Sequence, residues 1–183
     1  MQFEPTAFAG CFLIVPKKFG DERGFFSEVF RESEFREAGI AHSWVQDNHS
    51  YSATPGTLRG LHLQVEPFAQ AKLLRVTRGA ILDVVVDVRP ASATFRQHFA
   101  VELSAANWKQ IYVPVGFAHG FCTLTPDCEV QYKVSAPYSP THERGVNWND
   151  PELAIAWPEH LGPFTMTDRD RNWPQLTEFL ARK

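Results

Sequence analysis

Cysteine is scarce in this chain, and the three that occur have no structural spacing. Cys11, Cys122 and Cys128 form no C-x-x-C pair, and three is an odd number. A disulfide framework and a zinc knuckle are therefore disfavoured. The pattern fits a reducing compartment, and we predict a cytoplasmic protein.

Long apolar runs and a basic field are also missing. No hydrophobic stretch approaches the ~18 residues that a membrane-spanning helix needs. The apolar stretch from Ala7 to Val15 is followed, not preceded, by Lys17 and Lys18, the reverse of a signal peptide. The net charge is −3, so neither nucleic acid nor a membrane is expected as a partner.

Strand signals dominate what is present. From Ile81 to Val88 the sequence alternates with a period of two, which is typical of a strand. The other short apolar or alternating runs are Phe12–Val15, Gly24–Arg31, Trp44–Ser52, Leu58–Gln64, Lys72–Thr77, Phe95–Leu103, Gln110–Val113, Phe117–Leu124 and Val130–Ser135. Many short strands separated by turn residues predict one mostly-β domain over residues 1–183, a β-sandwich or barrel.

Helix signals are few. Ser33 is expected to cap a short helix through Ala38, and Pro174 to open another that runs to Leu180. The segment from Tyr138 to Pro158 is rich in Pro, Asn, Asp and Gly, and we interpret it as a long ordered loop.

Two histidine segments carry the densest chemistry. In Arg59-Gly60-Leu61-His62-Leu63-Gln64, the side chains of His62 and Gln64 share one face of a strand. A second histidine, His119, ends the pattern Pro-x-Gly-x-x-His. Each histidine alone could be a solvated surface residue, but two on separate strands of an aromatic-rich barrel indicate a pocket.

These two segments resemble the two motifs of the cupin superfamily. A metal-binding cupin would place a histidine where Gln64 stands and a glutamate shortly after it, whereas here Lys72 adds a cation to the region. The usual four-ligand set is broken, so a bound metal is not expected. A metal-dependent cupin oxygenase remains an alternative.

A metal-free pocket can still carry out proton transfer. A histidine is the natural base near neutral pH, and Tyr132, on a predicted strand, is a candidate acid. A lysine or second histidine could stabilise an enolate. Together these groups describe removal of a proton next to a carbonyl, followed by reprotonation.

The charged residues leave several alternatives open. Asp87 stands beside Arg89 and is expected to be a structural ion pair, whereas Asp83 could orient a histidine. The run from Thr167 to Arg171 is either a solvated charge cluster or part of the site. Anion-binding candidates are Arg23, Arg59, Lys72 and Arg169.

Taken in order, nine segments resemble the dTDP-4-dehydrorhamnose 3,5-epimerases over nearly the whole chain. These are Phe19–Phe26 with Glu28, Val45–Ser50, Thr57–Gln64, Gln70–Leu73, Asp83–Arg89, Pro114–Phe121, Tyr132-Lys133, Tyr138–Pro140 and Val146–Pro151. The resemblance implies a cupin-type jelly roll that works without metal or cofactor, as a homodimer. It also implies inversion of C3 and C5 of the dTDP-4-keto-6-deoxyhexose substrate through an enolate.

The same resemblance assigns roles to residues. His62 is implied as the base, Asp170 as the carboxylate that orients it, Tyr132 as the acid and Lys72 as the cation near the enolate oxygen. The implied substrate-binding residues are Arg23, Glu28, Gln46, Asn48, Arg59, His119, Glu143 and Arg169, with Tyr138 stacking on thymine. Arg169 stands where the family usually has lysine. A mono-epimerase acting at C3 or C5 alone, and a non-catalytic sugar-nucleotide binding protein, remain alternatives.

Overall fold

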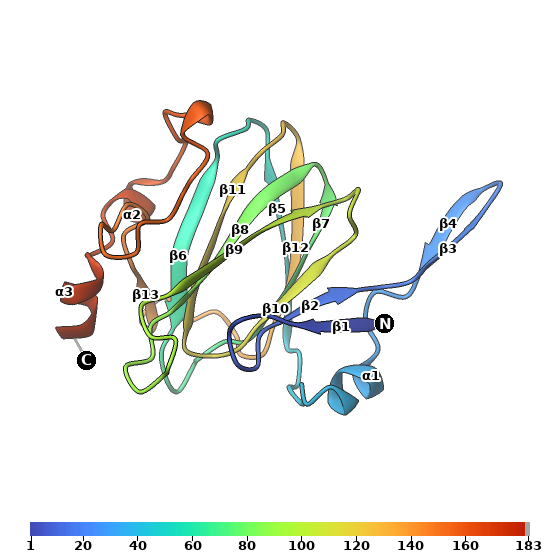
Figure 1. Cartoon of the computed structure of the whole chain (residues 1–183), viewed down its shortest axis with the longest axis horizontal. Helices are drawn as coiled ribbons and strands as arrows, with labels where there is room; N and C mark the ends of the chain where they lie inside the picture. The colour runs from blue at the N-terminus through green and yellow to red at the C-terminus, as the bar shows by residue number, and fades with distance from the viewer. Residues whose placement is uncertain (182–183) are drawn as a thin grey trace.

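Two antiparallel β-sheets packed face to face make up the body of the protein (Figure 1). The computed structural model describes residues 1–181. One sheet has the strand order β1-β2-β10-β7-β12-β5, and the other β13-β6-β11-β8-β9. Their bounds are β1 Gln2–Pro5, β2 Phe12–Val15, β5 Gln46–Ser52, β6 Leu58–Gln64, β7 Lys72–Arg78, β8 Ala80–Asp87, β9 His98–Ser104, β10 Gln110–Val113, β11 Phe117–Thr123, β12 Cys128–Val134 and β13 Glu143–Gly145. The mostly-β jelly-roll prediction is confirmed.

Alternation along the strands fills the space between the sheets. Ile81 and Val85 of β8 meet Leu74 and Val76 of β7 in one buried cluster, because side chains two residues apart share a face. The opposite face of β8 is not solvated: Val84 and Val86 pack in a second cluster with residues of the C-terminal segment. The central strands of the five-stranded sheet are therefore buried on both faces.

The C-terminal segment supplies that second cover. Its elements are η1 (Glu159–Leu161), α2 (Asp168–Arg171) and α3 (Leu176–Ala181), which lie beside β6 and β13 in Figure 1. Leu176 and Phe179 of α3 are buried against the sheet. This packing brings α2 to β6, although the two are more than a hundred residues apart in sequence.

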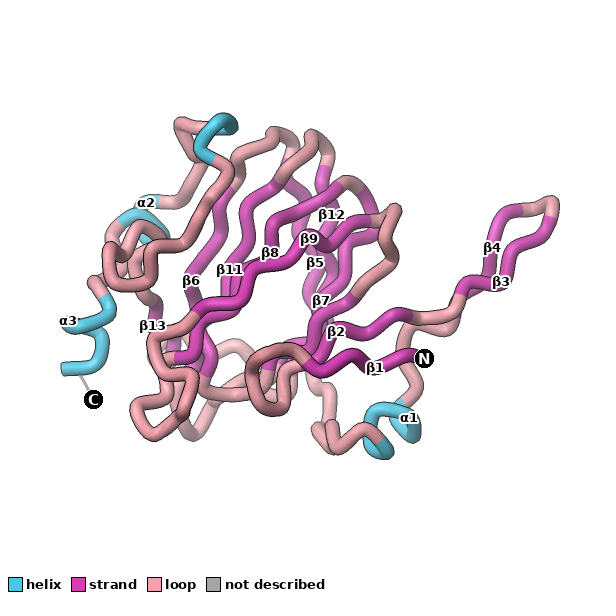
Figure 2. Tube along the Cα trace, in the orientation of Figure 1, coloured by secondary structure: helices cyan, strands magenta, loops and turns pink. Residues whose placement is uncertain are grey.

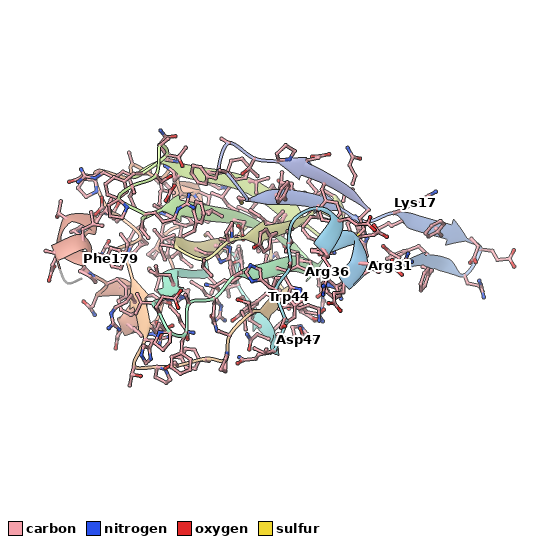
Figure 3. The ribbon with its side chains drawn as sticks, turned by 90° about the horizontal axis from the view of Figure 1, so that it is seen from below. Lys17, Arg31, Arg36, Trp44, Asp47 and Phe179 are labelled. Carbon is pink, nitrogen blue, oxygen red and sulfur yellow. The ribbon has the colours of Figure 1, made fainter. Side chains whose placement is uncertain are left out.

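A hairpin projects from the body at the other end. Within residues 1–181, β3 (Lys18–Asp21) and β4 (Gly24–Ser27) pair only with each other, and Figure 2 shows them extending away from both sheets. In Figure 3 this arm reaches outward beyond Lys17, whereas Phe179 lies at the opposite end of the molecule. Its side chains Phe19, Phe25 and Phe26 are 53%, 54% and 69% exposed. Aromatic side chains grouped and exposed in this way are typical of interaction surfaces.

Several local predictions were wrong. β1, β3 and α2 were not predicted, and β13 lies inside the segment predicted to be a loop. The strand predicted from residue 24 to 31 ends at Ser27, and α1 (Glu32–Glu37) begins after the extended Arg31, so Ser33 lies in its first turn and does not cap it. No helix in the described part of the chain is long and apolar enough to cross a membrane.

Candidate active site

A polar cavity of about 380 Å³ opens between the two sheets. Strands β5, β6, β7, β11 and β12 wall it, and α2 closes one side. The residues that line it are Gln46, Asn48, Ser50, Arg59, His62, Leu63, Gln64, Gln70, Lys72, Leu74, His119, Gly120, Phe121, Tyr132, Tyr138, Glu143, Thr167, Arg169 and Asp170. The fold therefore gathers eleven of the thirteen predicted site residues around one space.

His62 and His119 are direct cross-strand neighbours in the pairing of β6 with β11. The two backbones approach unusually closely there. A Cβ added to Gly60 would lie 2.5 Å from the Cα of Gly120, so neither strand could carry a side chain at this crossing. Because cross-strand neighbours project to the same face of a sheet, both imidazoles point to the cavity side.

The His62 imidazole is held by a carboxylate from α2. Its Nε2 lies 2.5 Å from Asp170 Oδ1, and the Asp170 side chain is almost completely buried. Burial acts to raise the pKa of Asp170, but hydrogen bonds and charge from His62, with Thr167 and Arg169, outweigh it and hold the pKa below its usual range. Since Asp170 occupies Nε2, Nδ1 is the ring nitrogen left for a substrate. The predicted orienting role of Asp170 has this contact as its support.

His119 has a carboxylate partner of its own. Its Nε2 lies 2.9 Å from Oδ2 of Asp83, a fully buried residue of β8. The other oxygen of Asp83 has no hydrogen-bond partner among the described residues. The hypothesis that Asp83 orients a histidine fits this geometry. Asp87, by contrast, forms the expected structural pair with Arg89 at 2.7 Å.

Lys72 and Tyr132 add a cation and a phenol to the same cavity. Lys72 Nζ donates to the carbonyl oxygen of His62 at 3.3 Å. Burial lowers the pKa of Lys72 to about 8, although Glu143 and Asp83 act in the opposite direction. Burial also raises the pKa of Tyr132, so its phenol keeps its proton over the physiological range.

The mouth of the cavity carries a hydrogen-bonded network. Arg169 Nη1 lies 2.5 Å from Glu143, and the Tyr138 hydroxyl donates to the same carboxylate at 2.9 Å. The backbone N–H of Tyr138 donates to Gln46, whose side-chain amide donates in turn to Asn48. Tyr138 is 47% exposed, which leaves its ring free to stack on a planar ligand.

Arg59 stands on the far wall of the cavity. Its guanidinium donates to the Tyr51 carbonyl and to the Ser52 hydroxyl of β5, a strand of the other sheet. These bonds are long, 3.2 and 3.4 Å, and only neutral oxygens accept them. The charge of Arg59 is therefore available to an anion in the cavity.

Two predicted site residues lie elsewhere. Arg23 is at the turn of the projecting arm, where it pairs with Asp21 at 2.5 Å, and Glu28 follows β4 and pairs with Arg31 at 2.8 Å. Neither lines the cavity within the described chain. Their position near or on an arm that leaves the body explains why one chain does not bring them to its own site.

Sequence reasoning gave no role to Gln64, which the structure makes a tether. Its amide donates to the carbonyls of Phe68 and Pro137 and accepts from the N–H of Ser139. These bonds fix the loop that carries Tyr138. A buried glutamine on the same strand face as His62 was the available signal. In the described part of the chain, no group of three or more His, Cys, Asp or Glu side chains is arranged to hold a metal ion.

Thr167 was also missed as a functional residue. Its hydroxyl accepts a hydrogen bond from the backbone N–H of Asp170 and so caps the first turn of α2. The signal was present in the sequence, because a threonine followed three residues later by an acid is a helix-start pattern.

Comparison with known proteins gives a consistent result. A family model described as dTDP-4-dehydrorhamnose 3,5-epimerase matches residues 5–178. A dTDP-4-dehydrorhamnose 3,5-epimerase of Sinorhizobium fredii is 51% identical over 97% of this chain and 91% of its own length. The solved structure of the Bacillus anthracis enzyme of that name, with TDP and PPi bound, superposes with a TM-score of 0.92 at 50% identity, covering 95% of this chain and 98% of its own.

A relative with a narrower activity is also similar. The 3'-monoepimerase of Streptomyces bikiniensis, solved in complex with dTDP-quinovose, superposes with a TM-score of 0.90 at 38% identity. The match covers 97% of this chain and 90% of the other. Sugar-nucleotide epimerases of two specificities therefore share this backbone.

Proposed function

The chain belongs to the dTDP-4-dehydrorhamnose 3,5-epimerase family, and from that premise we propose that it converts dTDP-4-dehydro-6-deoxy-D-glucose to dTDP-4-dehydro-L-rhamnose. The reaction is an isomerisation that inverts C3 and C5 of the ketosugar, in dTDP-L-rhamnose biosynthesis. The observation that carries the proposal is the His62–Asp170 pair, which faces a cavity also lined by Tyr132. One cavity thus brings together the three side chains to which the proposal gives the roles of base, orienting carboxylate and acid.

The 4-keto group makes the hydrogens on both neighbouring carbons acidic. His62 removes the proton from C5, and the electron pair of that C–H bond moves to form a C=C bond while the carbonyl oxygen becomes an enolate. Asp170 holds the imidazole and stabilises its cationic form. Tyr132 then donates its phenolic proton to the other face of the carbon, the ketone re-forms, and the centre is inverted. Proton exchange with solvent then returns His62 to its neutral form and Tyr132 to its phenol, and the same cycle at C3 completes the reaction.

Lys72 is the electrophile in this proposal. Its side chain is largely but not completely buried in the cavity wall, and it lies next to the strand that carries His62. An ammonium group in a cavity of low dielectric stabilises a developing enolate oxygen far better than it would in water. The lowered pKa leaves Lys72 charged below pH 8, where the charge is needed.

The nucleotide end of the substrate occupies the mouth of the cavity. Tyr138 stacks on thymine, and Gln46, Asn48 and Glu143 hold polar groups of the nucleotide sugar. The cationic groups Arg59 and Arg169, together with His119, bind the diphosphate. Arg169 keeps the positive charge of the lysine that is usual in the family, and its planar fork permits bidentate contact with a phosphate.

We further propose that the protein is a homodimer in which each arm reaches the cavity of the other copy. The exposed aromatic face of the arm supports this arrangement, as does the position of Arg23 and Glu28 away from their own cavity. In a second copy, those two side chains would complete the binding set. A cytoplasmic location is supported by three free thiols, Cys11, Cys122 and Cys128.

Incubation of the purified protein with dTDP-4-dehydro-6-deoxy-D-glucose in D₂O tests the reaction. We expect deuterium at both C3 and C5, followed by the L-rhamno product, with NMR as the readout. Folded protein that exchanges neither position would refute the function. Exchange and inversion at one carbon only would assign it instead to the mono-epimerases, the second candidate, which the similarity to the Streptomyces bikiniensis enzyme favours.

Subunit complementation tests the arm. Arg23→Ala and His62→Ala chains are co-expressed, and activity is compared with each variant alone. In a mixed dimer with crossed arms, the intact His62 site receives the intact Arg23 arm, so activity rises above the sum of the two variants. No gain, in a mixture shown to contain mixed dimers, would mean that the arm serves its own chain.

A further inference from the structure

His62 has a neighbour that the proposed mechanism does not use. The Trp173 ring lies with its centroid 5.9 Å from that of the His62 ring, at an interplanar angle of 71°. Edge-to-face contacts of this kind are directional as well as apolar. Trp173 does not line the cavity, so the indole contacts the base from a side that substrate does not occupy.

The indole occupies space that a glycine leaves open. Gly145 of β13 pairs directly with His62 of β6, so any side chain at position 145 would project beside the imidazole. A Cβ built there would lie 2.3–2.6 Å from the Cγ, Cδ2 and Cε2 atoms of Trp173. Cγ is the atom through which the indole is attached, and Cδ2 and Cε2 are its ring-fusion atoms, so none of the three is at the flexible end of a side chain. Trp173 therefore takes the place of the cross-strand neighbour that Gly145 lacks.

The backbone of Trp173 is fixed to the same strand region. The side chain of Asn147 donates to the Trp173 carbonyl at 3.1 Å, and its backbone N–H donates to the carbonyl of Pro174 at 2.8 Å. Asp170, the carboxylate partner of His62, lies three residues before Trp173. One short segment thus supplies both the carboxylate that bonds the imidazole and the ring that packs against it.

Packing, not hydrogen bonding, holds the indole in place. Its Nε1 is buried and has no hydrogen-bond partner among the described residues. The ring is held between the Gly145 backbone and the His62 imidazole by its shape. A flat aromatic ring without an N–H would therefore serve as well.

We propose that Trp173 is a positioning residue for the base, and that Gly145 is required because it admits the indole. Asp170 fixes one nitrogen of His62 but leaves the ring free to swing about that bond; the indole blocks the swing on the side away from substrate and excludes water there. This inference rests on the proposed function, since it assigns a purpose to the orientation of His62. A base displaced by about 1 Å can cost about 10²-fold in rate.

The test compares Trp173→Ala, Trp173→Phe and Gly145→Ala with wild type. Each variant is assayed for kcat, KM and deuterium exchange at C3 and C5, and dTDP binding is measured by calorimetry. We expect Trp173→Ala and Gly145→Ala to lower kcat and exchange by about tenfold to hundredfold while KM and the Kd for dTDP stay within about twofold. Trp173→Phe is expected to keep kcat within about threefold of wild type, because ring shape is retained.

Trp148→Ala is the matched control. Trp148 is also a partly buried tryptophan, but its ring packs edge-to-face on Phe164, 5.4 Å away, outside the five-stranded sheet. Its kcat should remain within about twofold of wild type. If Trp148→Ala loses kcat as Trp173→Ala does, the effect is a general one of losing an indole, and the inference is wrong.

Other outcomes decide as clearly. The inference is overturned if Trp173→Ala binds dTDP normally and keeps full kcat. It is also overturned if kcat and dTDP affinity fall in parallel, because that result would indicate a merely structural role. If Trp173→Ala fails to fold, the other two variants test the proposal. A wild-type kcat in Trp173→Phe together with a reduced kcat in Gly145→Ala supports positioning. A tenfold or larger loss of kcat in Trp173→Phe refutes it. An inactive wild type overturns the proposed function and the inference together, whereas an active wild type with indifferent variants overturns the inference alone.

Discussion

The two histidine–carboxylate pairs of the cavity use the same residue types at directly opposed positions of β6 and β11, yet they differ in how they are built. His119 takes Asp83 from β8, the adjacent strand of the same sheet, and both side chains are at least 95% buried. His62 takes Asp170 from α2, 108 residues along the chain, and its ring is 22% exposed to the cavity.

This difference indicates how one fold could put the same two residue types to two different uses. A pair made inside a sheet is rigid and enclosed, which suits it to hold a binding group in place. A pair completed by a separate segment leaves the imidazole at the edge of the cavity, where one nitrogen is bonded and the other is free for chemistry. The predictions below test whether the two pairs divide the work in this way.

The largest expected effect on rate comes from the His62–Asp170 pair. His62→Ala removes the proposed base, and we expect the rate of deuterium exchange at C3 and C5 to fall by about 10²–10⁴-fold. Binding of dTDP, measured by calorimetry, should be unchanged because His62 is assigned to the sugar end of the cavity. His119→Ala is the comparison variant and should weaken dTDP binding more than it slows exchange at saturating substrate. The reverse pattern would exchange the roles of the two histidines.

The next-largest effect is expected at Asp170, the carboxylate partner of His62. Asp170→Asn keeps the shape of the side chain but removes the charge that stabilises the cationic imidazole, so we expect kcat to fall by about 10²-fold. Single-turnover rates of exchange provide the measurement, with thermal unfolding as a control for fold. A variant of wild-type rate would show that His62 acts without Asp170.

Substitution in the His119–Asp83 pair should lower the stability of the protein more than the reaction rate. Asp83→Asn alters a fully buried carboxylate whose one hydrogen bond among the described residues is to His119, and the replacement exchanges a charged acceptor for a neutral amide. We expect the free energy of unfolding to fall by about 1–3 kcal/mol, measured by urea denaturation. The loss of kcat should be smaller than that in Asp170→Asn; a larger loss would contradict the division of roles.

The smallest effect is a shift in pH dependence. Lys72, whose pKa is lowered to about 8, is an ammonium group below that pH and neutral above it, so stabilisation of the enolate is lost as pH rises. We expect kcat to decline above about pH 8 by up to about tenfold per pH unit. In Lys72→Arg the side chain stays charged, and the alkaline decline should move to higher pH even if the maximum rate is lower. An unchanged alkaline limb would assign it to another group.

Local patterns predicted most strands because burial on one or both faces leaves a clear trace in sequence. The alternation from Ile81 to Val88 predicted β8, and the short run Phe117–Leu124 predicted β11. β13 was missed because three residues, Glu143–Gly145, form a strand only by pairing with β6 at the sheet edge. α2 was missed because four charged or polar residues carry no apolar period.

The site residues were also predicted where the signal was local and missed where it depended on distant contacts. The sequence identified His62 and His119 as pocket residues from their motifs, and the shared face of β6 accounts for Gln64 beside them. It left open whether the run from Thr167 to Arg171 was a solvated cluster, because nothing local distinguishes a buried aspartate from an exposed one. It gave no hint of Trp173, whose contact with His62 depends on the side-chain space left by Gly145.

By itself, therefore, the sequence determined which residues could act as base, acid, cation and anion-binding groups, and that they would stand on strands of a β-sandwich. These properties depend on residue chemistry and on a period of two, both of which are local. Only the tertiary structure decided that Asp170 reaches His62, that Asp83 reaches His119 and that the arm carries Arg23 away from its own cavity. Such pairings join segments that are far apart in the chain. They are fixed by the packing of the C-terminal segment on the five-stranded sheet and by the register of β6, β8 and β11. Neither the packing nor the register can be predicted from any single stretch of residues.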